Sequence, residues 1–364
     1  MSDVTFLCAY ELARMIGDRN ISATEVLEAY LAAITKHNPN LNAIIATLNE
    51  NQARLRAQEA DEALSRRRGP LHGVAITVKD YFETAGLRTT CSYKPLANYI
   101  PKTDATAVAR LKAAGAIILA KMNMPKQAVG FQTDSPLLGR ANNLWNLECT
   151  PGGSSGGGAA AVAAGLSPLD LGSDGGGSIR IRLAAPGPIA RSGDNREWEV
   201  PSTIQENLPQ RSLQEMRFAW TDNFGGVPVT TETREVLKKV ALRLEELRCH
   251  LEQCNPSDFD FSEAWETFGE ICGAQVVAHE SALGKLQYKL LGLIGRSQNQ
   301  SAFLRGISRG FGLNLRQYLD ALERRDRFAC SLEQFLCQYD GWVGPVTPGP
   351  AFTHRQVSSP LGFP

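Results

Sequence analysis

The sequence predicts an α/β fold, in which helices cover both faces of a mixed, mostly parallel central sheet. Two observations support this prediction. Short apolar runs rich in β-branched residues, at 74–78 and 117–119, flank a helical pattern at 105–114, which together make a strand–helix–strand unit. Farther along, a Gly-rich loop at 151–158 runs into an Ala-rich helix that ends near Gly165.

The alternation of strands and helices continues to the end of the first half. An apolar run at 169–171 leads to a second glycine cluster at 175–177. Near the start of the chain, residues 22–37 are predicted to form an amphipathic helix, because Ser22 and Glu25 have capping-box spacing and apolar residues recur at helical intervals. Further helical patterns lie at 51–67, 231–251, 262–283 and 313–339.

The character of the sequence changes after residue 187. Residues 192–211 are polar and have little periodicity, which indicates an irregular connection. From about 230 to 340 the chain is predicted to be mainly helical, and 343–350 is a Pro-rich extended or turn segment. There is no internal repeat, so we expect a single domain over residues 1–364.

The charges of the chain balance. There are 38 Lys and Arg residues and 38 Asp and Glu residues, so no net field attracts a phosphate backbone or an anionic membrane. The longest basic run, at 66–68, ends a helical pattern, where cations suit the helix dipole. We therefore expect a small-molecule partner rather than nucleic acid or a membrane; homo-oligomer formation is left open.

The cysteines and histidines give no sign of a metal site. The eight cysteines are scattered without a C-x-x-C pair, and the five histidines lack metal-ligand spacing, so we expect neither metal nor cofactor and a reduced, cytoplasmic setting. No basic stretch precedes an apolar run at the start of the sequence, and no window approaches the roughly 18 apolar residues of a membrane span. Neither secretion nor membrane insertion is predicted.

Three motifs carry the candidate chemistry. The first is Val78-Lys79-Asp80 at a predicted strand end, and the second is G-G-S-S-G-G at 152–157, which contains Ser154. The third is G-S-D-G-G-G-S-I-R at 172–180, which contains Ser178. Each alone is weak evidence, because a lysine after a strand is usually solvated and a glycine-serine loop is usually a flexible turn.

In this order the three motifs resemble the amidase signature family. The family's core motif runs G-G-S-S-G-G, an Ala-rich helix, and then G-[ST]-D-x-G-G-S-I-R. The resemblance includes Lys121-Met122-Asn123 and covers about residues 71–181, which look like the family's catalytic core. It implies an amidase that hydrolyses a carboxamide to a carboxylic acid and ammonia or an amine, with Ser178 as nucleophile, Ser154 as bridging serine and Lys79 as base.

The chemistry needs these residue types. A serine hydroxyl is a weak nucleophile until a base takes its proton, and an amide also needs its leaving nitrogen protonated. Lysine titrates near pH 10.4 in water, so Lys79 can act as a base only if burial favours its neutral form. We expect activity to rise with pH, and Ser178→Ala and Lys79→Ala each to abolish turnover. By resemblance, the peptide bond Gly153–Ser154 is cis.

The glycines before Ser178 are interpreted as an oxyanion hole. Gly175, Gly176 and Gly177 lack side chains, so their backbone N–H groups can turn toward one point beside the nucleophile. Three charged residues of the motifs are interpreted as scaffolding rather than catalytic groups: Asp80, Asp174 and Arg180.

Two other enzymes fit parts of the same pattern. Residues 153–157 also satisfy G-x-S-x-G, the nucleophile elbow of α/β hydrolases, but no good strand precedes Ser155, and neither His279 nor His354 has a supporting motif. Within the resembled family, the glutaminase subunit of a tRNA-dependent amidotransferase uses the same triad. The segment 131–134 looks more like stand-alone amidases.

Two departures from the family pattern motivate a third hypothesis. Arg182 stands where the family has proline, and residues 187–192 resemble a segment that is much later in the family, so we expect a block of the core to be missing. Residues 343–348 resemble a P-x-x-P landmark that a long segment normally follows, whereas the sequence stops at Pro364. The alternative is therefore an incomplete, non-catalytic remnant.

Overall fold

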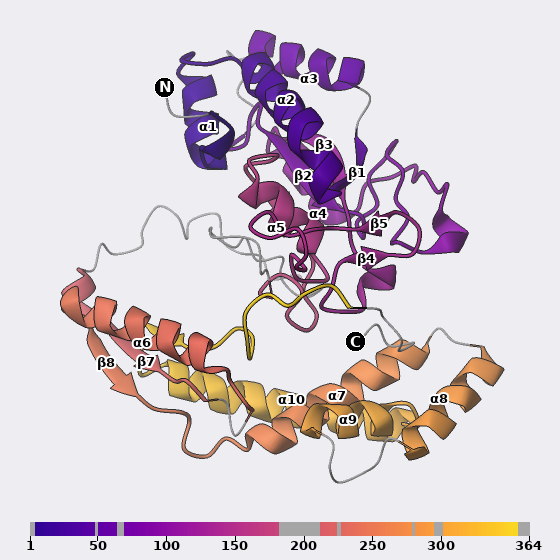
Figure 1. Ribbon diagram of the computed structural model, residues 1–364, viewed down its shortest axis with the longest axis vertical. Coiled ribbons are helices and arrows are strands. Elements are labelled where there is room, and N and C mark those ends of the chain that lie inside the picture. The colour runs from indigo at the N-terminus through magenta and orange to yellow at the C-terminus, as the bar shows by residue number, and fades with distance from the viewer. Residues whose placement is uncertain are drawn as a thin grey trace. The chain divides into compact units, whose positions relative to one another are not determined.

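The computed structural model describes residues 4–47, 50–63, 69–181, 212–223, 227–278, 281–294 and 301–355. The chain divides into two compact units, one formed by Met1–Glu199 with Pro350–Pro364 and the other by Val200–Gly349. Each unit is described by itself (Figure 1). The expectation of a single domain over residues 1–364 is not tested by this division and stays a prediction.

Several sequence-based predictions fall outside the described residues. They concern the basic run at 66–68 and the irregular connection at 192–211. Arg182, the stretch at 183–192 and His279 also lie outside them.

The first unit carries the predicted strand–helix–strand order. Its strands and helices begin and end within a few residues of the predicted bounds, and the helix predicted at 22–37 extends to Leu41. The elements are η1 (Val4–Phe6), α1 (Ala9–Gly17), α2 (Ala23–Leu41), β1 (Ile44–Thr47), α3 (Glu50–Glu62), β2 (Ala75–Lys79), η3 (Lys94–Leu96), α4 (Thr106–Ala113), β3 (Ile117–Met122), η4 (Lys126–Ala128), β4 (Asp134–Ser135), β5 (Gly139–Arg140), α5 (Gly156–Ala163) and β6 (Asp170–Leu171).

The central sheet of this unit has four strands in the order β1-β3-β2-β6. Strand β2 pairs in parallel with both β3 and β6, and β1 pairs antiparallel with β3. Helix α2 packs against β2, α3 against β3, and α5 against β2 and β6. The predicted α/β fold, with a mixed and mostly parallel sheet covered by helices, is therefore confirmed.

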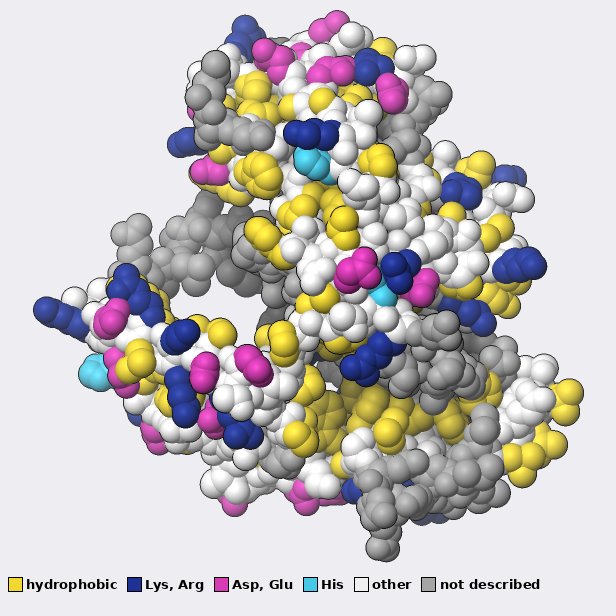
Figure 2. Space-filling view, in the orientation of Figure 1, with side chains coloured by type: hydrophobic (Ala, Val, Ile, Leu, Met, Phe, Trp, Pro, Cys, Tyr) yellow, Lys and Arg dark blue, Asp and Glu magenta, His cyan; other side chains and the backbone are white. Residues whose placement is uncertain are grey.

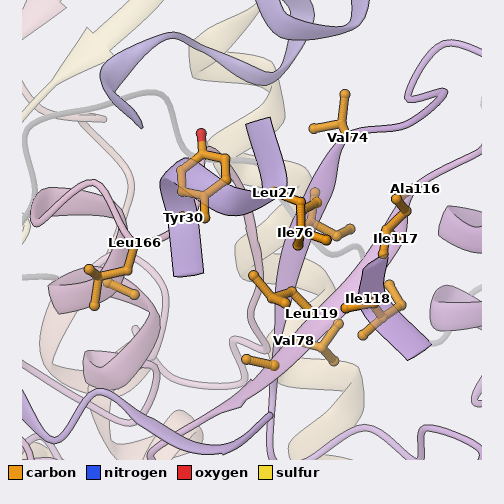
Figure 3. Close-up of a cluster of buried hydrophobic side chains, with 14 of the residues drawn as sticks. Leu27, Tyr30, Val74, Ile76, Val78, Ala116, Ile117, Ile118, Leu119 and Leu166 are labelled. Carbon is orange, nitrogen blue, oxygen red and sulfur yellow. The ribbon is translucent and has the colours of Figure 1, made fainter. Parts of the chain in front are cut away.

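Strands β2 and β3 form the centre of the hydrophobic core. Every residue of both strands is buried, which explains why they are continuous apolar runs rather than alternating ones. Apolar side chains of α2 and of the segment after α5 pack against them (Figure 3). The labelled residues of this cluster are Leu27, Tyr30, Val74, Ile76, Val78, Ala116, Ile117, Ile118, Leu119 and Leu166.

Helix α2 begins at the predicted capping box. The Ser22 hydroxyl accepts a hydrogen bond from the Glu25 N–H at 3.0 Å, and the Glu25 carboxylate accepts one from the Ser22 N–H at 2.8 Å. Two N–H groups that the first helical turn leaves unpaired are thereby satisfied.

The second unit is mainly helical, as predicted, but it also contains a small sheet that the sequence patterns did not indicate. Three short parallel strands pair in the order β8-β7-β9. The helix predicted at 231–251 ends at Glu246, and the strand His250–Gln253 takes up its last residues. The elements are η5 (Leu213–Glu215), β7 (Arg217–Trp220), α6 (Thr231–Glu246), β8 (His250–Gln253), α7 (Phe261–Ala278), α8 (Ala282–Ile294), α9 (Ala302–Gly310), α10 (Leu315–Leu336) and β9 (Gly341–Val343).

Helices α7 and α9 approach each other closely at glycines. A Cβ added to Gly273 would lie 2.4 Å from the Ile307 carbonyl oxygen, a distance that atoms do not tolerate. We expect Gly273→Ala to lower the free energy of unfolding by about 1–3 kcal/mol, the usual cost of overpacking. Denaturant-induced unfolding measures this change.

The matched control for that prediction is Gly312→Ala. A Cβ there would have the Arg309 carbonyl oxygen as its nearest neighbour, at 3.8 Å, which is an ordinary contact. An equal loss of stability in the two variants would contradict this explanation, because only the methyl group added at Gly273 would force α7 and α9 apart.

The surface shows mixed charges. On the face in Figure 2, basic and acidic side chains are interspersed, in keeping with the balanced composition. Within the described ranges, no helix has both the length and the apolar character needed to cross a membrane. The eight cysteines are free thiols.

Candidate active site

Lys79 ends strand β2 and is completely buried. Its Nζ atom lies 2.7 Å from Ser154 Oγ and 2.9 Å from Ser173 Oγ, and 3.4 Å from the Ser173 carbonyl oxygen. The structure thus brings two of the predicted triad residues into direct contact. Ser173 was not among the predicted site residues, although it stands inside the third motif.

The protonation of Lys79 is strongly affected by its surroundings. Burial lowers the pKa of Lys79 to about 7, while the nearby carboxylates Asp170 and Asp174 act in the opposite direction. A charged amine loses its hydration in such a site, so the neutral form is favoured. A lysine with a pKa near 7 is able to accept a proton at neutral pH.

Ser154 lies in the glycine loop that precedes α5. It is completely buried, and the Gly153–Ser154 peptide bond is cis, as the resemblance implied. Gly153 has no room for a side chain, because a Cβ would lie 2.7 Å from the Phe131 carbonyl carbon. The loop therefore has its backbone pressed against a neighbouring segment, which fixes the position of the serine.

Ser178 lies in the turn after the second glycine cluster and is half-buried. Its carbonyl oxygen accepts a hydrogen bond from the Ser155 N–H at 3.1 Å, which ties the turn to the loop that carries Ser154. Among the described residues, no hydrogen bond joins the Ser178 and Ser154 side chains. The structure therefore joins the two segments that carry these serines by a backbone hydrogen bond. A proton relay between the two serine side chains stays a prediction.

Asp174 organises the turn around Ser178. Its carboxylate accepts hydrogen bonds from the backbone N–H groups of Gly177 at 2.6 Å and Ile179 at 2.9 Å. It also forms an ion pair with Arg180, whose Nη2 lies 2.9 Å from Oδ1. Although burial opposes the effect, the hydrogen bonds from Arg180 and the backbone keep the pKa of Asp174 well below its usual range. This arrangement agrees with scaffolding roles for both residues.

The same contacts alter the predicted oxyanion hole. The Gly177 N–H is already donated to Asp174, so in this structure it is not directed at a substrate. The carboxylate directly before the glycine cluster thus competes for the Gly177 N–H, and the oxyanion hole of three glycines stays a prediction. Gly175 and Gly176 remain as candidate donors.

The elbow alternative finds no support among the described residues. The Ser155 hydroxyl donates to the Ser173 carbonyl oxygen at 3.3 Å rather than to a histidine. His354 Nε2 lies 3.2 Å from the Leu147 carbonyl oxygen, in a contact with the backbone.

A second buried lysine, Lys121 on β3, lies beside the same strand. Its Nζ contacts the Phe82 carbonyl oxygen and lies 3.1 Å from Thr84 Oγ1, so it holds the segment that follows β2. Burial lowers the pKa of Lys121 to about 8, against the attraction of Asp80. Asp80 is also buried, and its carboxylate accepts hydrogen bonds from the backbone N–H and hydroxyl of Thr90. Both residues thus fix the loop after Lys79.

Comparison with known proteins identifies the class. Residues 25–182 match the family model described as Amidase. A crystal structure described only as an amidase matches with a TM-score of 0.72 and 26% identity, over 96% of this chain and 84% of that chain. Residues 25–182 therefore match the amidase signature family, which confirms the resemblance carried by the three motifs.

Curated relatives at higher identity carry one description. The chain is 45% identical over 175 residues to a glutamyl-tRNA(Gln) amidotransferase subunit of Geotalea daltonii, and the match covers 48% of this chain and 36% of that protein. It is 48% identical over 168 residues to the protein of the same description from Roseiflexus sp. (strain RS-1), covering 46% and 34%. The matches thus span about a third of the length of these relatives.

Solved structures at lower identity share the fold. Fatty acid amide hydrolase matches with a TM-score of 0.77 and 20% identity, over 96% of this chain and 70% of that chain. The corresponding glutamyl-tRNA(Gln) amidotransferase subunit of Thermotoga maritima matches with a TM-score of 0.70 and 22% identity, over 99% and 83%. At these identities the likeness concerns architecture alone.

Proposed function

We propose that the chain hydrolyses a carboxamide through an acyl-enzyme on Ser178. The observation that carries this proposal is the buried Lys79 amine at 2.7 Å from Ser154 Oγ, with its pKa lowered to about 7. A neutral amine in hydrogen-bond contact with a buried hydroxyl is a base positioned for proton transfer.

The reaction follows two half-steps. Neutral Lys79 takes the proton of Ser154, which takes that of Ser178, while Ser178 Oγ forms a bond to the amide carbon. As the tetrahedral intermediate collapses, the C–N bond breaks and the proton returns along the same path to the leaving nitrogen. Water then gives its proton to the relay and its oxygen to the acyl carbon, which frees Ser178 and the carboxylic acid.

The negative oxygen of the intermediate needs hydrogen-bond donors. The N–H groups of Gly175 and Gly176 are the candidates beside Ser178, since Asp174 holds that of Gly177. Asp174, paired with Arg180, thus stabilises the turn in which these donors lie.

We expect kcat/KM to rise with pH through a midpoint near 7, the pKa to which burial lowers Lys79. The sign follows from the base: below the midpoint Lys79 carries its proton and cannot accept another, and above it the amine is free. Initial rates measured from about pH 6 to about pH 10 on a simple amide test this expectation. A flat profile over that range would remove lysine from the role of base.

Glutamine is a second candidate substrate. The curated relatives at 43–48% identity are described as subunits of glutamyl-tRNA(Gln) amidotransferases, which favours glutaminase activity over the stand-alone amidase that the segment 131–134 suggested. Ammonia release from glutamine, compared with release from simple aliphatic and aromatic amides, distinguishes the two. Preference for glutamine, together with co-purification of a second protein chain, would establish the amidotransferase role.

The rival hypothesis is a non-catalytic remnant. We expect a serine-directed fluorophosphonate to label Ser178, as located by peptide mass spectrometry, and the label to be lost in Ser178→Ala. An unlabelled but folded protein would favour the remnant, because labelling needs both an activated nucleophile and an oxyanion hole.

The cellular setting of this activity is also a proposal. A cytoplasmic location is proposed because the cysteines are scattered without a C-x-x-C pair, and the balanced charge of the chain argues against nucleic-acid or membrane binding. The amide as small-molecule partner follows from the proposed reaction. Cell fractionation with an antibody to the chain tests the location, and recovery in the membrane fraction would contradict it.

A further inference from the structure

A buried carboxylate, Asp170, shares a face of the sheet with Lys79. Strand β6 pairs in parallel with β2, with Asp170 opposite Thr77. Thr77 and Lys79 are two residues apart on β2, so their side chains project from the same face. The Thr77 hydroxyl donates to Asp170 Oδ1 at 3.0 Å, which holds the carboxylate on that face.

Helix α5 is shaped to accommodate this carboxylate. A Cβ added to Gly158 would lie 1.9 Å from Asp170 Oδ2, so only glycine leaves space for it. Gly158 is in the first turn of α5, where the aligned peptide dipoles favour a negative charge. Asp170 is only 8% exposed, so solvent screens its charge weakly.

The other two groups that raise the pKa of Lys79, Asp174 and Cys91, have their negative charge paired or absent. Asp174 is paired with Arg180. The Cys91 thiol, from the loop after β2, has its pKa raised by burial and is therefore neutral at pH 7. Of the groups that attract the charged lysine, Asp170 acts most strongly, ahead of Asp174.

Helix α5, which packs against both β2 and β6, adds no charge beside Asp170. Helix α5 (Gly156–Ala163) contains only glycine, alanine and valine. Lys121 on β3 is in register with Val78, so its side chain projects from the face of the sheet opposite Lys79. Asp80 follows Lys79 directly, so it projects from that opposite face too.

We propose that Asp170 is a positioning residue for the base, because its negative charge, held on the face of Lys79 by Thr77 and Gly158, stabilises the protonated amine. It thereby sets the pH at which the amine becomes free. The proposal rests on the proposed role of Lys79 as base. Burial alone drives a lysine toward a weakly basic neutral amine, whereas a base is most effective when it titrates near the working pH. Asp170 restores part of the basicity that burial removes.

The test is to measure the titration of Lys79 itself. Full-length protein with lysine labelled at the ε-carbon is titrated by NMR, and the Lys79 signal is assigned by its loss in Lys79→Met. In Asp170→Asn, which keeps the size that Gly158 allows, we expect the Lys79 midpoint to fall by about one pH unit or more, the usual effect of removing a close opposite charge. The midpoint of kcat/KM against pH should fall with it.

The matched control is Asp104→Asn. Asp104 is a carboxylate paired with Lys112 at 2.7 Å and is not among the groups that act on Lys79, so the midpoint should not move. If Asp170→Asn does not fold, Asp170→Ser removes the same charge and leaves a hydroxyl for Thr77.

The outcomes separate this inference from the proposed function. An unchanged Lys79 midpoint in a folded Asp170 variant overturns the inference, even if the variant is less stable, because a merely structural role predicts that result. A wild-type protein whose Lys79 titrates near pH 7 but which hydrolyses no amide contradicts the proposed function and leaves the effect of Asp170 measurable.

Discussion

Replacing Ser178 with alanine is expected to reduce kcat for amide hydrolysis by about a millionfold, the loss seen when a serine hydrolase loses its nucleophile. The acyl-enzyme cannot form without the Ser178 oxygen, so binding and the oxyanion donors are all that remain. Single-turnover measurements with a chromogenic amide quantify the loss. Thermal unfolding should be little changed, because the side chain is half-buried and small.

The neighbouring serine provides the control for this variant. Ser155→Ala removes the hydroxyl that donates to the Ser173 carbonyl oxygen. We expect at least a tenth of the activity to remain, because a single hydrogen bond of this kind contributes little. The reverse result, with Ser155→Ala inactive and Ser178→Ala active, would restore the elbow hypothesis and exclude the triad.

Lys79→Met is expected to abolish turnover while the protein keeps or gains stability. Methionine is close to lysine in length but cannot accept a proton, so the loss in kcat should approach that of Ser178→Ala, since residues of one relay act as a unit. The stability expectation follows from the pKa: below about pH 7 the folded protein holds a buried charge that favours unfolding. Kinetics and thermal unfolding on the same preparation measure both effects.

The protonation of Lys79 gives the pH dependence of the free energy of unfolding a defined direction. Because the folded-state pKa of Lys79 lies below the value near 10.4 of lysine in water, the unfolded chain binds more protons between about pH 7 and that value. The wild type should therefore gain stability with rising pH in that range, and Lys79→Met should gain less. A partly exposed lysine, Lys112, serves as control, and Lys112→Met should keep full activity. Activity retained in Lys79→Met would contradict the assignment of the base.

Much of the first unit was predictable from sequence because its strands are buried on both faces. Strands β2 and β3 are apolar runs without alternation, and the helix between them has a clear period. The second unit was less predictable. Its strands have three or four residues, and β8 follows α6 so closely that the two read as one helical pattern.

The site shows a similar division. The resemblance of the three motifs to the amidase signature family implied that Lys79 and Ser154 work together, and the structure shows their contact. Two further features depend on side-chain direction, which sequence does not specify: the contact of Ser173 with the lysine, and the capture of the Gly177 N–H by Asp174. The residues of a motif do not show which atoms their side chains will contact in the folded protein.

The three oxygen atoms around Lys79 Nζ suit both of its protonation states. A charged amine has three N–H bonds to donate, and the oxygen atoms of Ser154 and Ser173 lie within 2.7–3.4 Å to receive them. A neutral amine has two donors and one lone pair, which the two Ser173 oxygens and the Ser154 hydroxyl satisfy equally well. A proton can thus cross from serine to lysine while every heavy atom stays in place, so the reorganisation that water would require is avoided.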